Sequence, residues 1–384
     1  AVLYDAQATL LEDTLVREKN RLRVSLEGGA EDDAAALLGR VTRCIDGALA
    51  AAGARAQQIA AVGCATYASS ALGLDASNQP CTPIYTYADT RSAAAADALR
   101  RSLDEAAVHQ RTGCLLRTSY LPALFTWLAD DQPDLVRTTQ RWASIGEWLF
   151  GVFFGRSTIT YSSAAWTGLL NRTQLMWDAD LLADLPVRVE QLGTLADVDT
   201  PLIGLKPEFA ARWPALARIP WFGAVGDGAA ANLGSGCVDA QRIALSIGTS
   251  GALRVVLGSN PQTPYGLWCY RVDRSAPLLG GATSEGGNVL DWVRRTFQIE
   301  TQALDHYLND PAGAAHGLAV LPFVAGERSP GWSGDARATI SGITLATSAL
   351  DVARAALEGV TYRWAQIATL LRTTVPGMPL IVAS

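Results

Sequence analysis

The chain has 384 residues, enough for two domains or one large one, and its 49% hydrophobic and 18% charged residues are typical of a globular protein. The net charge of −6 indicates no basic surface, so nucleic acid is not an expected partner. Three histidines without an HxxxH pair and six cysteines without a CxxC pair do not match the usual metal-site spacings. No uncharged apolar stretch of about 18 residues occurs, so we expect no membrane span, and we place the protein in a reducing cytoplasm.

Short strand-like runs alternate with alanine-rich helical segments in the first half of the chain. Residues 59–66 (IAAVGCAT) and 71–76 (ALGLDA) are typical of strands, whereas 32–53 and 92–112 are typical of helices. This alternation predicts an α/β architecture. Four prolines between positions 201 and 220 interrupt both periodicities, so we place the connection to a second domain there, with domains at 1–219 and 220–384.

The second half contains a clear hairpin pattern and a long helix. Residues 242–247 (RIALSI) and 252–258 (ALRVVLG) flank the turn GTSG, which is a strand–turn–strand signal. Residues 280–297 are typical of a strand end followed by a helix. Residues 347–373 give the strongest helical pattern in the chain, and Asp351 near its start suits the helix dipole.

One carboxylate stands between two glycines in residues 226–236 (GDGAAANLGSG). A helical segment follows Asp227, and a helix N-terminus stabilises a carboxylate, while the flanking glycines let another molecule approach closely. A capped surface turn is the alternative interpretation, and this stretch alone does not exclude it. Gly226, Gly228 and Ala231 also fit GxGxxA, but no acidic residue follows about 20 positions later, so we do not expect a dinucleotide site.

The turn Gly248–Thr249–Ser250 offers backbone N–H groups and two hydroxyls. Small residues of this kind hold phosphate oxygens without bulk. An ordinary glycine-rich hairpin turn explains the same residues equally simply. The turn by itself therefore leaves both interpretations open.

Residues 322–359 resemble the C-terminal signature of the FGGY carbohydrate kinases, in the segments GERSP and RAALEG and at Arg337, Gly342 and Asp351. In that family a GD[QGN] element opens the second domain, a GTS turn follows, and a GG…GG…W segment comes next. This chain has the same order of motifs: Gly226–Gly228, Gly248–Ser250, Gly280–Gly281, Gly286–Gly287 and Trp292.

The first half of the chain is similar to the same family. Residues 82–100 resemble the family's W-x-D-x-R stretch, with Tyr87 at the tryptophan position, and residues 112–134 and 162–171 resemble the segments that follow. Leu124 stands where the family carries a lysine, which puts the usual local packing or ion pair in doubt. The family's opening Asp-x-Gly-Thr-Thr turn and its C-terminal glycine pair beside adenine are missing, so we expect the full protein to continue beyond both ends.

The resemblance implies an α/β, two-domain actin-like ATPase fold (ribonuclease H-like) with an interdomain cleft. Sugar would bind mainly to the first domain and ATP mainly to the second. Asp227 would be the general base, would contact the substrate and would lie at the Mg²⁺ site. The residues implied for ATP binding are Gly248, Thr249, Ser250, Gly286 and Gly287.

The sugar site would draw on Asp89, Arg91, Ser69 and Tyr120, with Ser119 as an alternative to Tyr120. A carboxylate and a guanidinium bind polyols, and Arg91 could pair with a substrate carboxylate, although an Asp–Arg pair that only caps the next helix is equally consistent. The motifs are most similar to those of gluconate kinases, with xylulose as the alternative substrate. A non-catalytic sugar-binding protein on the same fold and a homodimer both stay open.

Overall fold

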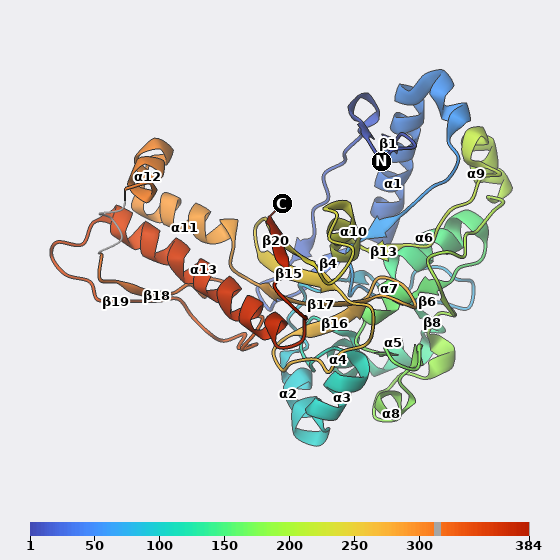
Figure 1. Ribbon diagram of the computed structural model, residues 1–384. Helices are drawn as coiled ribbons and strands as arrows, with labels where there is room; N and C mark the ends of the chain where they lie inside the picture. Colours follow the sequence, from blue (N-terminus) through green and yellow to red (C-terminus); the bar gives the residue numbers. More distant parts are fainter. Residues whose placement is uncertain (311–315, 384) are drawn as a thin grey trace. The chain divides into compact units, whose positions relative to one another are not determined.

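The protein, described here by a computed structural model over residues 1–310 and 316–383, divides into two compact units (Figure 1). The first unit comprises Ala1–Ala230 together with Tyr270–Arg274, and the second comprises Ala231–Cys269 together with Ser275–Ser384. Across the part of the chain that is described, no helix combines the length and the apolar character that a bilayer span requires.

The first unit combines helices and short strands, as the α/β prediction requires, although α2 to α5 follow one another without a strand between them. Its helices are α1 (Ala34–Ala52), α2 (Ala93–Ser102), α3 (Glu105–Thr112), α4 (Leu121–Asp131), α5 (Pro133–Thr138), α6 (Ile145–Phe154), α7 (Tyr161–Ala165), α8 (Ala179–Leu182) and α9 (Pro207–Arg212), and α10 (Asp227–Gly234) crosses its boundary. Its strands are β1 (Leu3–Tyr4), β2 (Leu10–Leu11), β3 (Arg23–Val24), β4 (Ala30–Asp32), β5 (Ala65–Thr66), β6 (Leu72–Leu74), β7 (Ile84–Tyr85), β8 (Arg141–Ala143), β9 (Ile159–Thr160), β10 (Leu170–Asn171), β11 (Met176–Trp177), β12 (Leu195–Ala196) and β13 (Val225–Gly226).

Two apolar clusters lie in the core of the first unit. One joins α1, α6, β6 and the aromatic residues Trp213 and Trp221, and the other joins α4 with β7, β8 and the segment 181–187. Trp213 is fully buried, and its ring stacks on those of Phe209 and Trp221. Burial of these large rings supplies much of the apolar area that stabilises the unit.

The second unit is built on a mixed sheet. Its strands are β14 (Arg242–Ile247), β15 (Gly251–Val256), β16 (Trp268–Arg271), β17 (Pro277–Thr283), β18 (Ala319–Leu321), β19 (Thr339–Ser341) and β20 (Leu380–Ala383). The last two residues of β16 belong to the first unit. Five of them form a sheet in the order β16-β17-β15-β14-β20, and β14 pairs antiparallel with β15 and parallel with β20. The hairpin predicted over residues 242–258 is therefore confirmed.

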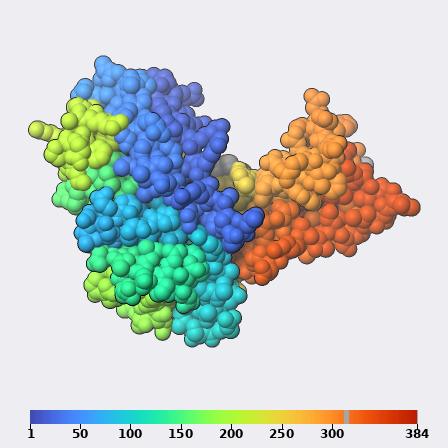
Figure 2. All heavy atoms as spheres, turned by 180° about the vertical axis from the view of Figure 1, so that it is seen from behind, coloured from blue at the N-terminus to red at the C-terminus, as the bar shows by residue number. Residues whose placement is uncertain are grey.

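The helices of the second unit are α11 (Gly287–Phe297), α12 (Thr301–Leu308) and α13 (Ala349–Arg372). The first half of α13 packs on α11 and α12, and its last turns pack on the sheet through Ile367 and Leu371. In Figure 2 the atoms of α11 to α13 gather in one region, coloured orange to red. Ser348 and Asp351 form a capping box at the start of α13, which explains why the predicted helix begins there.

Two local predictions differ from the structure. The helix predicted over 92–112 is broken into α2 and α3, because the Asp104 side chain accepts a hydrogen bond from the Ala107 N–H and starts a new helix. Only Ala65 and Thr66 of the predicted strand 59–66 form a strand, because the chain before them follows a loop with an isolated bridge from Val62 to Trp221.

Candidate functional site

Asp227 lies at a junction between a strand and a helix in the first unit. Strand β13 pairs in parallel with β5, so that Val225 lies opposite Ala65 and Gly226 lies opposite Thr66. Asp227 is the first residue of α10, is exposed, and accepts a hydrogen bond from the Gly228 N–H at 2.7 Å through Oδ1. An acidic side chain is favourable at this position, because the helix N-terminus carries a partial positive charge.

Trp166 explains why position 226 is a glycine. A Cβ atom at Gly226 would lie 2.7 Å from Trp166 Nε1, so only a glycine lets the backbone before Asp227 pass the indole ring. The Trp166 ring stacks on Tyr270, with ring centroids 4.0 Å apart. Tyr270 is buried, so of the two rings only the half-buried Trp166 has exposed apolar area that could pack on the C–H face of a sugar. The Trp166 ring lies beside the backbone that carries Asp227.

Ser69 and Tyr120 belong to the same neighbourhood. The Ser69 hydroxyl donates to the carbonyl oxygen of Trp166, and the hydroxyls of Tyr120 and Tyr270 lie 2.6 Å apart. Ser69 also has a φ angle of 53°, a left-handed conformation that costs energy for a non-glycine residue and often marks a functional position. The structure thus connects Ser69, Tyr120 and the Asp227 segment through Trp166 and Tyr270.

Asp89 and Arg91 form a separate ion-pair cluster with Glu31. Asp89 is 3% exposed, its carboxylate oxygens lie 3.1 Å from Arg91 Nε, and Arg91 also pairs with Glu31 at 2.6 Å. The guanidinium lies 4.6 Å from the ring centroid of Trp127. Hydrogen bonding to Asp89 raises the pKa of Arg91 above its ordinary value, which keeps the side chain charged.

The Asp89 carboxylate does not cap the next helix. It accepts hydrogen bonds from the N–H groups of Ala30 and Arg91, both at 3.1 Å, whereas α2 starts after Ser92 without a side-chain cap. The helix-capping alternative weighed for this pair is therefore wrong. The pair ties the segment before α2 to strand β4, and a substrate carboxylate would have to share Arg91 with two protein carboxylates.

The five residues predicted to bind nucleotide come together in the second unit. The exposed turn Gly248–Ser250 joins β14 to β15, and the N–H of Gly287 donates to the Gly248 carbonyl at 2.7 Å. A Cβ at Gly286 would lie 2.7 Å from the Ser250 carbonyl carbon, so a glycine is required for this close approach. The turn and the glycine pair thus form one compact loop cluster.

The N-terminus of α11 is already satisfied by this cluster. The N–H groups of Gly287 and Asn288 donate to the carbonyls of Gly248 and Thr249, and the Gly286 N–H donates to Asn288 Oδ1. Within residues 1–310 and 316–383, the hydroxyls of Thr249 and Ser250 make no hydrogen bond. The turn thus has two exposed hydroxyls and lies against a glycine pair that has no side chains. Such an arrangement can bind the phosphate groups of a nucleotide.

A buried carboxyl group lies directly before the glycine pair. Glu285 is fully buried, and neither of its carboxyl oxygens has a hydrogen-bond partner among the described residues. Burial raises the pKa of Glu285 to about 7, so the group is protonated in a large share of molecules at neutral pH. Sequence reasoning missed this residue, because nothing in the pattern TSEGGN distinguishes a buried glutamate from an exposed one.

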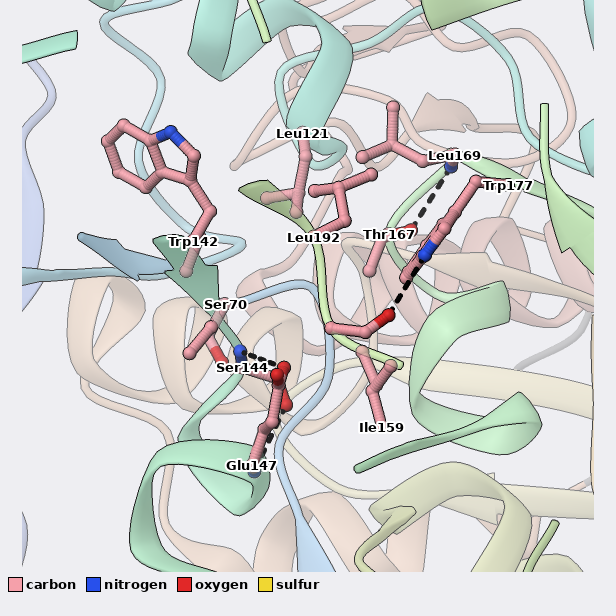
Figure 3. A pocket seen from close by; sticks show the side chains of 13 residues that line it. Ser70, Leu121, Trp142, Ser144, Glu147, Ile159, Thr167, Leu169, Trp177 and Leu192 are labelled. Atoms are coloured by element: carbon pink, nitrogen blue, oxygen red, sulfur yellow. Dashed lines mark hydrogen bonds between the residues drawn. The ribbon is translucent and has the colours of Figure 1, made fainter. Parts of the chain in front are cut away.

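Figure 3 shows a small cavity in the first unit, with Ser144 and Glu147 hydrogen-bonded on one side. Its volume, about 20 Å³, holds roughly one water molecule and excludes a sugar. Glu147 belongs to the capping box of α6 with Ser144, and burial raises its pKa to about 7. Across the cavity, Trp177 Nε1 donates to the carbonyl of Gly193 at 3.0 Å. The cavity is therefore a structural feature, separate from the predicted site residues.

Trp166 and Tyr270 were not among the predicted site residues. Trp166 lies in the stretch SSAAWTGLLN, whose likeness to the family segment was a usable signal. Tyr270 is 150 positions from Tyr120, and only the folded chain brings the two hydroxyls together. Residues 270–274 belong to the first unit although the flanking sequence belongs to the second.

Comparison with known proteins gives two family matches. The model of the N-terminal domain of the FGGY family of carbohydrate kinases matches residues 1–234, and the model of the C-terminal domain of that family matches residues 243–383. Gluconokinases from Bacillus licheniformis and Bacillus subtilis (strain 168) are each 30% identical over 307 residues, which cover 76% of this chain and 60% of each relative. The chain thus spans about 60% of the length of these curated relatives.

Two solved structures from Lactobacillus acidophilus are similar along the whole chain. A ligand-bound xylulose kinase and a gluconate kinase each give a TM-score of 0.90 with 26% identity and cover 100% of this chain. The alignments cover 78% and 77% of those chains, respectively. These matches confirm the predicted fold class, an α/β actin-like ATPase fold of two domains.

Proposed function

Because the chain belongs to the FGGY family of carbohydrate kinases, we propose that the protein transfers the γ-phosphate of ATP to a hydroxyl group of gluconate. The observation that carries the proposal is the cluster of Ser69, Tyr120, Trp166 and Tyr270 beside the backbone of Asp227. The Ser69 hydroxyl, the Asp227 carboxylate and the half-buried Trp166 ring are groups of the kinds that bind a polyhydroxylated substrate, and the buried Tyr270 ring stacks on Trp166. The gluconokinase relatives support gluconate among such substrates.

In the proposed mechanism the first unit binds the sugar and the second unit binds the nucleotide. Asp227 accepts the proton of the attacking hydroxyl, and the turn Gly248–Ser250 with Gly286 and Gly287 holds the β- and γ-phosphates. A carboxylate can serve as this base, because in phosphoryl transfer the hydroxyl loses its proton late in a loose transition state. Catalysis of this kind depends mainly on positioning and on charge stabilisation.

Mg²⁺ is the cofactor that this proposal requires. Among the described residues no group of three or more acidic, histidine or cysteine side chains lies together, so the phosphates and water would supply most ligands and Asp227 would supply one carboxylate. Magnesium ordinarily retains several waters and binds one or two carboxylates together with substrate phosphates, so the residues present fit. When bound, it neutralises part of the charge on the transferring phosphate.

Xylulose is the second candidate substrate, because a xylulose kinase is as similar in structure as the gluconate kinase. The family resemblance implies that the small residues Ala68 and Ser69 stand where glycerol kinases carry larger polar side chains, which argues against glycerol. Glycerol kinases are nevertheless among the relatives. The cytoplasmic location stays a prediction. A homodimer stays a prediction.

The substrate is tested by measuring ATP-dependent turnover of gluconate, xylulose, ribulose and glycerol by the complete gene product. We expect the highest kcat/KM for gluconate, and no gluconate turnover would refute the assignment. The role of the base is tested with Asp227→Asn, which should lower kcat by about 10²–10⁴-fold while sugar binding is retained. If the wild type is active and this variant has unchanged turnover, Asp227 is removed from the mechanism. If the wild type itself shows no turnover, the alternative of a non-catalytic sugar-binding protein is favoured.

A further inference from the structure

Asn288 joins three backbone groups of the loop cluster in the second unit. Its Oδ1 accepts from the N–H of Gly286 at 2.9 Å, and its Nδ2 donates to the carbonyl of Ser284 at 2.9 Å. Its own N–H donates to the carbonyl of Thr249 at 3.2 Å. One residue therefore connects the segment before α11 with the turn between β14 and β15.

The amide group of Asn288 is chemically matched to its two side-chain partners. One partner is a donor and the other is an acceptor, so a carboxylate of the same size would lose the donated bond and would face the Ser284 carbonyl oxygen without a proton. An alanine would lose both bonds and leave the Gly286 N–H unsatisfied in a buried position. Aspartate therefore removes one of the two side-chain bonds and adds a repulsion, whereas alanine removes both bonds.

The strand end before the glycine pair is fixed from the other side by α13. Trp364 Nε1 donates to Thr283 Oγ1 at 3.2 Å, and the Thr283 hydroxyl donates to the Glu285 carbonyl at 2.6 Å. Thr283 also pairs with Gly251 at the end of the turn, and its hydroxyl lies 3.4 Å from the Gly251 carbonyl oxygen. Between Thr283 and α11, the Asn288 side chain holds residues 284–286, and the backbone N–H groups of Gly287 and Asn288 donate to the carbonyls of Gly248 and Thr249. The Asn288 side chain therefore acts on the turn Gly248–Ser250 through the backbone of the Gly286–Gly287 pair.

We propose that Asn288 is a positioning residue, which fixes the turn Gly248–Ser250 in the conformation that binds the phosphates of ATP. The inference rests on the proposed function, because it assigns a role in nucleotide binding to a residue that does not itself present a group to the nucleotide.

The test combines two measurements on Asn288→Ala and Asn288→Asp in the complete gene product. Hydrogen exchange without nucleotide should become faster over residues 246–251 and 284–290 in both variants. The KM for ATP should rise about tenfold in Asn288→Ala, the effect of losing about one net hydrogen bond, and further in Asn288→Asp. The KM for the sugar should not change, because the sugar is assigned to the other unit.

Asn309→Ala is the matched control, because Asn309 is an exposed asparagine of the same unit whose Nδ2 donates, among the described residues, only to the Asp305 carbonyl in the preceding helix. It should change neither the exchange of residues 246–251 nor the KM for ATP. Suppose that the wild type binds ATP and that Asn288→Ala changes neither the hydrogen exchange of these residues nor the KM for ATP. That result would overturn this inference and leave the proposed function intact. A wild-type protein that binds no ATP would refute the proposed function and this inference together.

Discussion

The carboxyl group of Glu147 gives a quantitative prediction for the stability of the first unit. Its side chain is buried, Oε1 has no hydrogen-bond partner among the described residues, and Oε2 accepts from the Ser144 N–H at 3.3 Å. The nearest ion-pair contact, from Arg141, is 3.7 Å long. Burial therefore dominates and raises the pKa of Glu147 from 4.5 to about 7.

The sign of the pH dependence follows from this direction. Between pH 4.5 and pH 7 the folded state binds more protons than the unfolded state, so the free energy of unfolding falls as pH rises. The stabilisation is complete below the unfolded pKa and is lost as pH rises through about 7. Since one pKa unit corresponds to about 1.4 kcal/mol, ionised Glu147 destabilises the protein by about 3 kcal/mol at pH 8.

Glu147→Gln removes this effect, because glutamine is neutral at every pH and also suits the third position of a capping box. We expect the variant to be more stable than the wild type by up to about 3 kcal/mol at pH 8, and by less than about 1 kcal/mol at pH 5. The assay is urea unfolding followed by tryptophan fluorescence at several pH values between 5 and 8. The quantity to compare is the difference in the free energy of unfolding between the variant and the wild type, plotted against pH.

Glu208→Gln serves as the control, because Glu208 is exposed in the first turn of α9. Glu208→Gln removes a carboxylate from the same unit without removing a buried charge. Its effect on the free energy of unfolding should therefore not show the pH dependence expected for Glu147→Gln. A stability difference for Glu147→Gln that is equal at pH 5 and pH 8, or a destabilised variant at pH 8, would refute the argument from burial.

Three further predictions concern the core and the loop cluster. Trp213→Ala should lower the free energy of unfolding by about 3–5 kcal/mol, because the fully buried ring stacks on two others, and a loss below about 1 kcal/mol in denaturant unfolding would contradict this. Gly286→Ala should lower it by about 1–3 kcal/mol and raise the KM for ATP, because its Cβ would lie 2.7 Å from the Ser250 carbonyl carbon. In unfolding experiments Gly248→Ala is the control, since its Cβ meets open space, and equal losses in both variants would argue against the packing explanation. Glu285→Gln should raise the melting temperature more at pH 8 than at pH 6. Burial raises the pKa of Glu285 to about 7, and ionisation of this buried carboxyl group destabilises the fold. A difference in melting temperature that calorimetry finds to be independent of pH would disprove this.

Local patterns predicted the parts of the fold that depend on short-range interactions. The hairpin around Gly248–Ser250 and the helix α13 form where their periodicity indicates, and the Ser348–Asp351 capping box fixes the start of α13. The prediction failed at Asp104, where a capping side chain divided a segment whose alanine-rich composition indicated one helix. Capping competes with helix propensity at single positions, and composition averages over such positions.

The order of the motifs along the chain is specific, and it was enough to identify the family. The same motifs singled out the glycines at positions 226 and 286. The reason why those glycines are required became visible only in the folded chain, because the atoms that exclude a side chain, Trp166 Nε1 and the Ser250 carbonyl, come from distant segments. The same holds for Tyr270 beside Tyr120 and for the raised pKa values of Glu147 and Glu285. Close approach and burial are properties of the packed chain, and no pattern of neighbouring residues encodes the distance between segments that meet only after folding.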